Sequence, residues 1–555
     1  MAASSIAIRP SPIEIARTAA AAMPAEVSTK PLLGILGVVT GAGVVTLTSR
    51  MISLGMPDFR GLHGFGYDES AWIGTAFDVG LMFIGPFTVY LGGLMGPRRI
   101  LLTAAALFTV LLIFLPLVHS YSLVIAMALL GGLTAGTFYP LTLTFALRNI
   151  PLRYLPFTLA LYATFVDGAV NIAPSLYGWY RDNLSSNWMF WNSALITPLM
   201  MICIYCGIPK ASSAKKSGEA PSFAGFLYAS TGLAMLLAAC EQGERLDWWR
   251  SGVFNALFAG GAFFVLCALV RRLRGPNPLV ALPYLLKWNT ILLGFLLFWF
   301  RFTLCTTIIL VPQALAIRGF EPDQIGPAII WSAIPLIPLA FTAGLLLLRK
   351  FDSRLLLAIG LACTAFGAWL NSQYSSNWAA QNFYRTELLT GTGQAFAFIG
   401  LVGCIVLQAI FAGALAKPEW VLTFSAFFHT IRIFGGTTGA IYMGHFLAQR
   451  EKLHSNLLGL HVSGGWITGQ NIHAMSAGLY AKSSGMAAAG ARAIDVIAAR
   501  LRLQAYSLSI IDGFLLIAWS CACALIFVAM LRRSPLDYGD LSTQQQMQAF
   551  AKESK

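Results

Sequence analysis

Long apolar runs dominate this sequence and leave little of it for a water-soluble fold. Fourteen such runs, each of roughly twenty residues, follow one another along the 555 residues. A helix needs about twenty apolar residues to cross the hydrocarbon core of a bilayer. Only 11% of the residues are charged, whereas a soluble chain carries about 25%. The sequence therefore predicts an all-α integral membrane protein that acts within or across the bilayer.

Each apolar run is expected to form a helix, because lipid offers no hydrogen-bond partner to an open backbone. The predicted membrane spans are 31–54, 71–94, 100–118, 121–147, 155–178, 188–208, 222–241, 252–270, 288–315, 325–348, 354–371, 386–414, 419–447 and 507–531.

Basic residues collect in every second gap between these spans. Loops that face the cytoplasm carry an excess of Lys and Arg, so this alternation predicts that both termini are cytoplasmic. Polar stretches after the sixth and the eighth spans divide the fourteen helices into six, two and six. The expected units are a disordered cytoplasmic tail at 1–30, a six-helix bundle at 31–208, a linker with two inserted helices at 209–287, a six-helix bundle at 288–531 with an outer loop at 448–506, and a cytoplasmic tail at 532–555.

The remaining composition excludes several functions. The net charge of +14 is explained by the basic cytoplasmic loops, and no Lys/Arg tract with interleaved aromatics points to nucleic acid. The nine cysteines fall inside or at the edges of the spans, without metal-ligand spacing. No phosphate-binding glycine loop is present. We therefore expect no metal site, no cofactor, no catalytic residues and no enzyme activity.

Five segments carry a resemblance to a known family. They are Gly92 to Arg99 after the second span, Ala173 to Gly178 with Arg181 to Phe190 around the end of the fifth, Glu244 to Trp248 between the inserted helices, Val311 to Gly326 around the end of the ninth, and Arg432 to Gly436 with Arg450 to His454 on the thirteenth.

In these segments the chain resembles the major facilitator superfamily, specifically its fourteen-helix drug:proton antiporter branch of the EmrB/QacA type. The resemblance implies the major facilitator fold and a location in the cytoplasmic (inner) membrane as a multi-pass protein. It also implies a conformational motif that includes Gly96, Arg98 and Arg99 after the second span, with Pro174 and Gly178 on the fifth. In a host with two membranes it implies a periplasmic adaptor and an outer-membrane channel as partners.

The sequence also departs from the branch pattern. Branch members commonly carry an acid in the first span, in an L-D-x-T pattern, where this chain reads Leu47-Thr48-Ser49-Arg50. The arginine expected in the fourth span is absent, and Gly93 stands where many members have aspartate. The proton-coupling residues of the branch therefore cannot be transferred by position.

A few charges lie at membrane depth, where they are costly and usually face a partner or a polar cavity. Asp167 and Asp78 are the candidates for proton coupling. Arg50, Arg301 and Arg432 are candidates for substrate contact or charge pairing, because a guanidinium suits a carboxylate or phosphate group. One interpretation is that Arg50 forms an internal ion pair with Asp78 or Asp167.

The leading hypothesis is a secondary active transporter that exports amphipathic organic compounds by alternating access, driven by entering protons. Alternating access around a midplane site is typical of transporters built from repeats. The missing acid in the first span leaves a facilitator or solute importer of the same superfamily as an alternative, with an anionic substrate as one option. A more remote alternative is an integral membrane enzyme or receptor. In every case the expected partners are the lipid bilayer and a small-molecule substrate, not nucleic acid.

Overall fold

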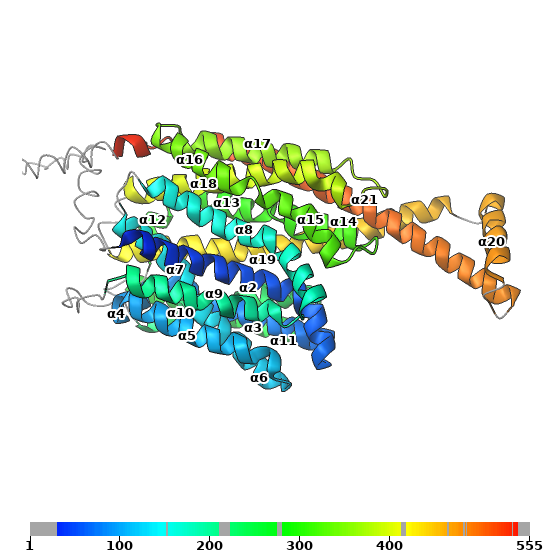
Figure 1. Ribbon diagram of the computed structural model, residues 1–555, viewed down its shortest axis with the longest axis horizontal. Coiled ribbons are helices and arrows are strands. Elements are labelled where there is room, and N and C mark those ends of the chain that lie inside the picture. Colours follow the sequence, from blue (N-terminus) through cyan, green and yellow to red (C-terminus); the bar gives the residue numbers. More distant parts are fainter. Residues whose placement is uncertain are drawn as a thin grey trace, which may run out of the picture.

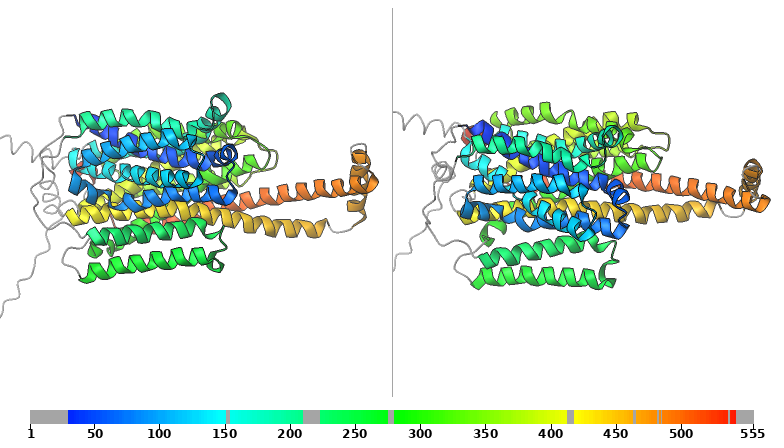
Figure 2. Two further views of the ribbon diagram at one scale, coloured as in Figure 1. Left: turned by 90° about the horizontal axis from the view of Figure 1, so that it is seen from below. Right: turned by 60° about the horizontal axis from the view of Figure 1, so that its bottom comes forward.

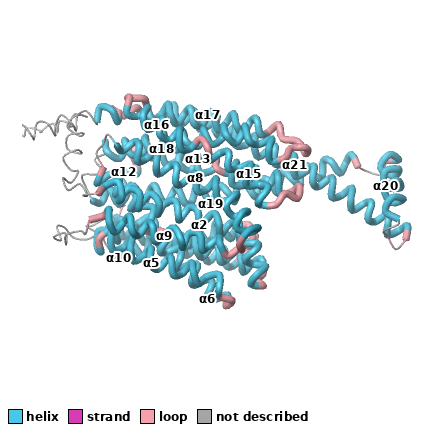
Figure 3. Tube along the Cα trace, in the orientation of Figure 1, coloured by secondary structure: helices cyan, strands magenta, loops and turns pink. Residues whose placement is uncertain are grey.

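The computed structural model is a bundle of long, roughly parallel helices from which one hairpin projects (Figures 1 and 2). It describes residues 30–150, 154–209, 223–274, 280–411, 418–462, 465–480, 483, 485–535 and 537–541. The described residues contain helices and loops and no strand (Figure 3). Thirteen helical segments in this part of the chain are long and apolar enough to cross a membrane. The predicted all-α, multi-span membrane fold is confirmed.

The first eight predicted spans correspond to helices, several of which are interrupted by short 3-10 turns. They are α2 (Pro31–His63), α3 (Tyr67–Ile84) with η1 (Gly85–Phe87) and α4 (Thr88–Met95), α5 (Pro97–Phe114) with η2 (Leu115–Leu117), α6 (Tyr121–Ala135) with α7 (Phe138–Asn149), α8 (Leu155–Asn183), α9 (Trp188–Gly207), α10 (Phe223–Gly243), and α11 (Gly252–Arg274) preceded by η4 (Trp248–Arg250).

The later spans follow the same plan. They are α12 (Leu282–Leu285) leading into α13 (Trp288–Thr303), η5 (Thr306–Leu310) and α14 (Val311–Ala316), then α15 (Pro322–Ala333) with α16 (Leu336–Leu348), α17 (Ser353–Asn371), η6 (Ala380–Phe383) with α18 (Tyr384–Phe411), α19 (Pro418–His461), α20 (Trp466–Leu479) and α21 (Met486–Met530). The predicted span 419–447 lies within α19, which is not among the thirteen apolar segments. The fourteenth crossing therefore stays a prediction.

Two groups of helices share one continuous apolar core. The N-terminal group comprises α2 to α9 and the C-terminal group α13 to α21, and buried side chains from both groups form the core. Helices α10 and α11 pack on each other, and α10 also packs on α3. Figure 2 shows this pair at one side of the bundle. The described chain starts and finishes at the same end of the bundle (Figure 1).

The outer loop is helical to a greater extent than predicted. The sequence predicted that Ala487 to Leu503 extends the last helix, and α21 does run without a break through Met486–Met530. Helix α19 is extended in the same direction as far as His461. At about 1.5 Å per residue, the 45 residues of α21 span ~68 Å, about twice the hydrocarbon thickness. The two helices project as a hairpin with α20 at its tip (Figures 1 and 2).

Candidate functional site

A charged cluster lies where the two helix groups meet. Asp167 is carried by α8 of the N-terminal group, and Arg301 and Arg432 by α13 and α19 of the C-terminal group. Asp167 is 1% exposed and Arg432 is 4% exposed. The carboxyl of Asp167 interacts electrostatically with both arginines. Three of the five charges singled out in the sequence therefore meet in space, although they are far apart along the chain.

The cluster holds its charges close without a direct ion pair. Among the described residues no salt bridge joins Asp167 to either arginine, and neither of its carboxyl oxygens has a hydrogen-bond partner. Burying a carboxylate without such partners costs several kcal/mol. The neighbouring positive charge offsets part of that cost. Asp167 is therefore poised to exchange a proton or to bind a polar group of a ligand.

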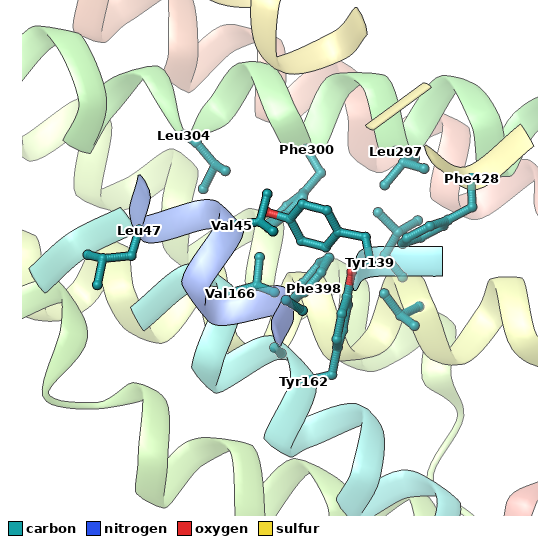
Figure 4. Packing of buried hydrophobic residues seen from close by; sticks show 14 of the residues in the cluster. Val45, Leu47, Tyr139, Tyr162, Val166, Leu297, Phe300, Leu304, Phe398 and Phe428 are labelled. Atoms are coloured by element: carbon teal, nitrogen blue, oxygen red, sulfur yellow. The ribbon is translucent and has the colours of Figure 1, made fainter. Parts of the chain in front are cut away.

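Aromatic side chains surround these charges. The guanidinium carbon of Arg432 lies 3.7 Å from the ring centroid of Tyr139, and Tyr139 also hydrogen-bonds Thr46. The ring of Tyr162 lies 5.9 Å from that of Phe398. Figure 4 shows Tyr139 and Tyr162 beside Phe398 at this meeting point. Aromatic faces beside a cation and a carboxyl suit an amphipathic organic molecule.

A polar link crosses the same interface one turn along α8. Asn171 donates a hydrogen bond of 2.8 Å from Nδ2 to Oε1 of Gln394 on α18. The amide of Gln394 in turn lies 3.4 Å from Oγ1 of Thr307 in η5, a single π-helical turn. Sequence reasoning missed this link, because Asn and Gln in apolar helices carry no pattern that identifies their partners.

Arg50 does not form the ion pair that was one interpretation of the sequence. Its Nη2 donates a 2.9 Å hydrogen bond to the carbonyl of Ile308 in η5. It therefore joins α2 to the C-terminal group through the backbone rather than through an acid. Pro312 stands four residues beyond Ile308 and has no backbone N–H, so this carbonyl lacks its usual α-helical partner and can accept from Arg50.

Asp78 lies away from the central cluster. Its carboxyl interacts electrostatically with Glu241 on α10, and both acids line one cavity together with Ser49 on α2. The sequence analysis placed Glu241 at the end of the predicted span 222–241 and did not select it as a candidate. The feature that could have identified it is an acidic residue among apolar residues near the end of a span. Its partner could be recognised only once α10 was placed against α3.

The outer part of α8 packs closely on α15. A Cβ on Gly178 would lie 2.6 Å from the backbone nitrogen of Asp323, so the two backbones meet. One turn further on, Arg181 forms ion pairs with Glu321 and Asp323. Pro174 is buried within α8, which continues unbroken past it.

At the opposite end of α8, Phe157 packs on Phe341 of α16, with ring centroids 6.3 Å apart. The groups touch on both sides of the cluster.

The turn after the second span carries three residues of the conformational motif. Gly96 adopts φ 88°, which favours glycine, and α5 begins directly after it. The guanidinium of Arg98 lies 4.4 Å from the ring centroid of Tyr205 on α9, and Arg99 is exposed. With Gly93 in place of the branch aspartate, Arg98 stacks on an aromatic ring.

The turn between the inserted helices is tied to the rest of the bundle. Nη1 of Arg245 lies 2.7 Å from Oδ1 of Asp68 at the start of α3. Nδ1 of His445 on α19 lies 2.9 Å from the Glu244 carboxyl, and this hydrogen bond lowers the pKa of Glu244. The segment Glu244 to Trp248 therefore anchors the inserted pair to α3 and α19.

Comparisons with known proteins agree with this architecture. Residues 38–440 match the Major Facilitator Superfamily. The chain is 24% identical over 421 residues to the probable multidrug resistance protein EmrY of Escherichia coli K12, which covers 74% of this chain and 79% of that protein. It is 22% identical over 430 residues to the fatty acid resistance protein FarB of Neisseria gonorrhoeae, covering 75% and 81%.

A solved structure supports the fold. The proton:xylose symporter XylE, a major facilitator protein, superimposes with a TM-score of 0.55 at 11% identity, and the match covers 93% of this chain and 99% of that one. The resemblance read from the sequence motifs is thus confirmed, and the bacterial relatives agree with a multi-pass protein of the inner membrane. The chain is a membrane transporter that belongs to the Major Facilitator Superfamily.

Proposed function

We propose that this transporter exports amphipathic organic compounds in exchange for protons. The observation that carries the proposal is the position of Asp167, buried between the two helix groups and facing Arg301 and Arg432 across their interface. Relatives named for multidrug and fatty acid resistance support the export direction.

Alternating access would follow from separating the groups 31–208 and 288–531, with α10 and α11 as an inserted pair between them in sequence. When the groups part, Asp167 on one leaves Arg301 and Arg432 on the other. An opposite charge favours the ionised carboxyl, and its removal favours proton uptake. Opening and closing would thereby change the proton affinity of Asp167, which is what coupling requires.

The net charge of the cluster of Asp167, Arg301 and Arg432 affects which class of substrate it binds and in which direction transport runs. Two arginines and one carboxylate leave a net positive charge, which suits an anionic group. A cationic compound would compete with the proton for Asp167 and would give antiport. An anionic compound would bind better when Asp167 is protonated, and this favours symport and therefore the alternative of a solute importer. Fatty acids, which FarB is named for, are anionic amphiphiles at neutral pH.

The test is transport in inside-out membrane vesicles with one cationic and one anionic amphipathic dye. Antiport predicts that an imposed proton gradient drives uptake of dye into the vesicles, and that an uncoupler abolishes it. Vesicles made without expression of this protein are the control. Dye uptake that persists in the presence of the uncoupler, or dye movement only in the direction of import, would contradict the proposal.

The projecting hairpin supports a second part of the proposal, namely an adaptor partner. An apolar stripe on its α19 arm is exposed, at Leu453 (43%), Leu457 (48%) and Leu460 (72%). At the base of the hairpin, Asp512 on α21 accepts hydrogen bonds from Arg450 and His454 on α19, at 2.6 and 2.7 Å. A stiff, braced arm with an exposed apolar face beyond the membrane suits an apolar helix of a periplasmic adaptor.

Changing Leu453, Leu457 and Leu460 together to glutamine is expected to reduce whole-cell resistance at least about tenfold, which corresponds to about 1.4 kcal/mol of lost partner binding. Transport in inside-out vesicles should stay at the wild-type level, because the adaptor acts beyond the membrane. Lys452→Gln with Asn456→Ser, on exposed neighbouring positions, is the matched control. Equal loss of vesicle transport would assign the stripe to folding of the transporter instead.

A further inference from the structure

A cavity lies away from the central cluster, between the N-terminal group and the inserted pair. Its volume is about 280 Å³. Helices α2, α3 and α10 form its walls, and the lining includes Ile52, Ser53, Met56, Phe77, Asp78 and Glu241. It is slightly below the range of about 300–1,000 Å³ that is usual for drug-sized ligands, so it suits a small organic molecule.

Two carboxylic acids meet in the wall of this cavity. Asp78 and Glu241 both line the cavity, and their carboxyl groups interact electrostatically. Oε1 of Glu241 is shielded from solvent and has no hydrogen-bond partner among the described residues. Each of these carboxyl groups is negative when it is ionised and then acts only as a hydrogen-bond acceptor.

No basic side chain neutralises this charge among the residues that line the cavity. Arg50, on the same helix as Ser49, donates to the carbonyl of Ile308 on the other side. Arg245, one turn beyond Glu241, donates hydrogen bonds to Asp68 and to Oε1 of Gln242. An uncompensated charge in a partly apolar cavity is costly, and a ligand of opposite sign removes that cost.

We propose that this cavity is a binding site for a small amphipathic organic cation, with Asp78 and Glu241 as its counter-charge. The remainder of the lining fits this class. Ile52 and Met56 offer apolar contacts, and Phe77 offers an aromatic face of the kind that attracts ammonium groups. The inserted pair thereby supplies one of the two acids of a site that is separate from Asp167.

The experiment is calorimetric titration of the purified full-length protein in detergent with benzyltrimethylammonium, without a proton gradient. Neopentylbenzene, the neutral carbon isostere, is the comparison ligand. Wild type is expected to bind the cation at least tenfold more tightly than the isostere. Asp78→Asn with Glu241→Gln is expected to lose this difference, because the double change removes the charge that either single change leaves in place. Asp495→Asn, on the exposed hairpin and outside the cavity, is the control and should bind as wild type does.

A second variant tests the site independently, in case the double variant of Asp78 and Glu241 does not fold. Ser53→Trp should fill the cavity and lower affinity for the cation at least tenfold while both acids remain. Unchanged binding in either the double variant or Ser53→Trp would overturn the proposal, as would equal affinity for the isostere. Asp167→Asn should retain the part of the cation binding that is lost when Asp78 and Glu241 are both changed, so a failure of the proton-coupled export mechanism is distinguishable from a failure of this site.

Discussion

Asp167→Asn is expected to reduce proton-driven export at least about tenfold. Asparagine keeps the size of the side chain and removes both the negative charge and the exchangeable proton. Arg301 and Arg432 would then lack the only carboxylate that interacts with them in the described cluster. Leaving buried charge uncompensated costs about 3–5 kcal/mol, so protein yield and melting temperature in detergent should fall as well. The measurement is gradient-driven dye uptake in inside-out vesicles, normalised to the amount of folded protein.

Two further variants distinguish coupling from stability. Asp167→Glu keeps the acid and should retain part of the proton-driven transport. Asp495→Asn removes an exposed carboxylate on the hairpin and should leave transport unchanged. Undiminished proton-coupled transport by Asp167→Asn would remove this residue from the mechanism. Counterflow without a gradient should survive in Asp167→Asn if substrate binding and the conformational cycle remain intact.

Gly178→Val is expected to reduce transport by hindering the closing of α8 on α15. The first side-chain atom would lie 2.6 Å from the nitrogen and 2.7 Å from the Cα of Asp323, and both are backbone atoms that cannot rotate away. Overpacking of this kind costs about 1–3 kcal/mol, enough to shift a balance between closed and open forms by about five- to 150-fold. Export should fall by a similar factor, and the ion pairs of Arg181 should break.

Hydrogen–deuterium exchange should report this opening directly. Deuterium uptake should rise in the last turns of α8 and the first turns of α15, and stay as in wild type in α17. The matched control is Gly444→Val on α19, because nothing lies within 4 Å of the added Cβ there. Wild-type exchange and transport in Gly178→Val would show that the close approach of α8 and α15 is not needed for the cycle.

Hydropathy located the helices because membrane insertion depends on the composition of each segment by itself. The predicted span 155–178 lies in α8 and the span 252–270 lies in α11. The segment 419–447 shows the limit of this reasoning. It contains His429 and Arg432, whose polarity lowers the mean hydropathy of a helix that is buried among other helices.

The choice of Asp167, Arg301 and Arg432 as candidates also came from the sequence alone, since a charge in an apolar run is visible without coordinates. The sequence did not show which of the charged residues lie next to one another. One interpretation of the sequence paired Arg50 with Asp78 or Asp167, but Arg50 donates to the carbonyl of Ile308. That carbonyl lacks its usual α-helical partner because Pro312, four residues on, has no backbone N–H, but the sequence does not show that helix packing brings Arg50 beside it.

The sequence by itself determined the all-helical membrane fold, the family and the residues that carry charge in the bilayer, because these properties belong to single segments and short motifs. The tertiary structure decided which charges meet. Asp167 faces two arginines from the other helix group, and Asp78 faces Glu241 on an inserted helix. Electrostatic interaction falls off with distance in space, and distance in space between helices far apart in the chain is set by packing.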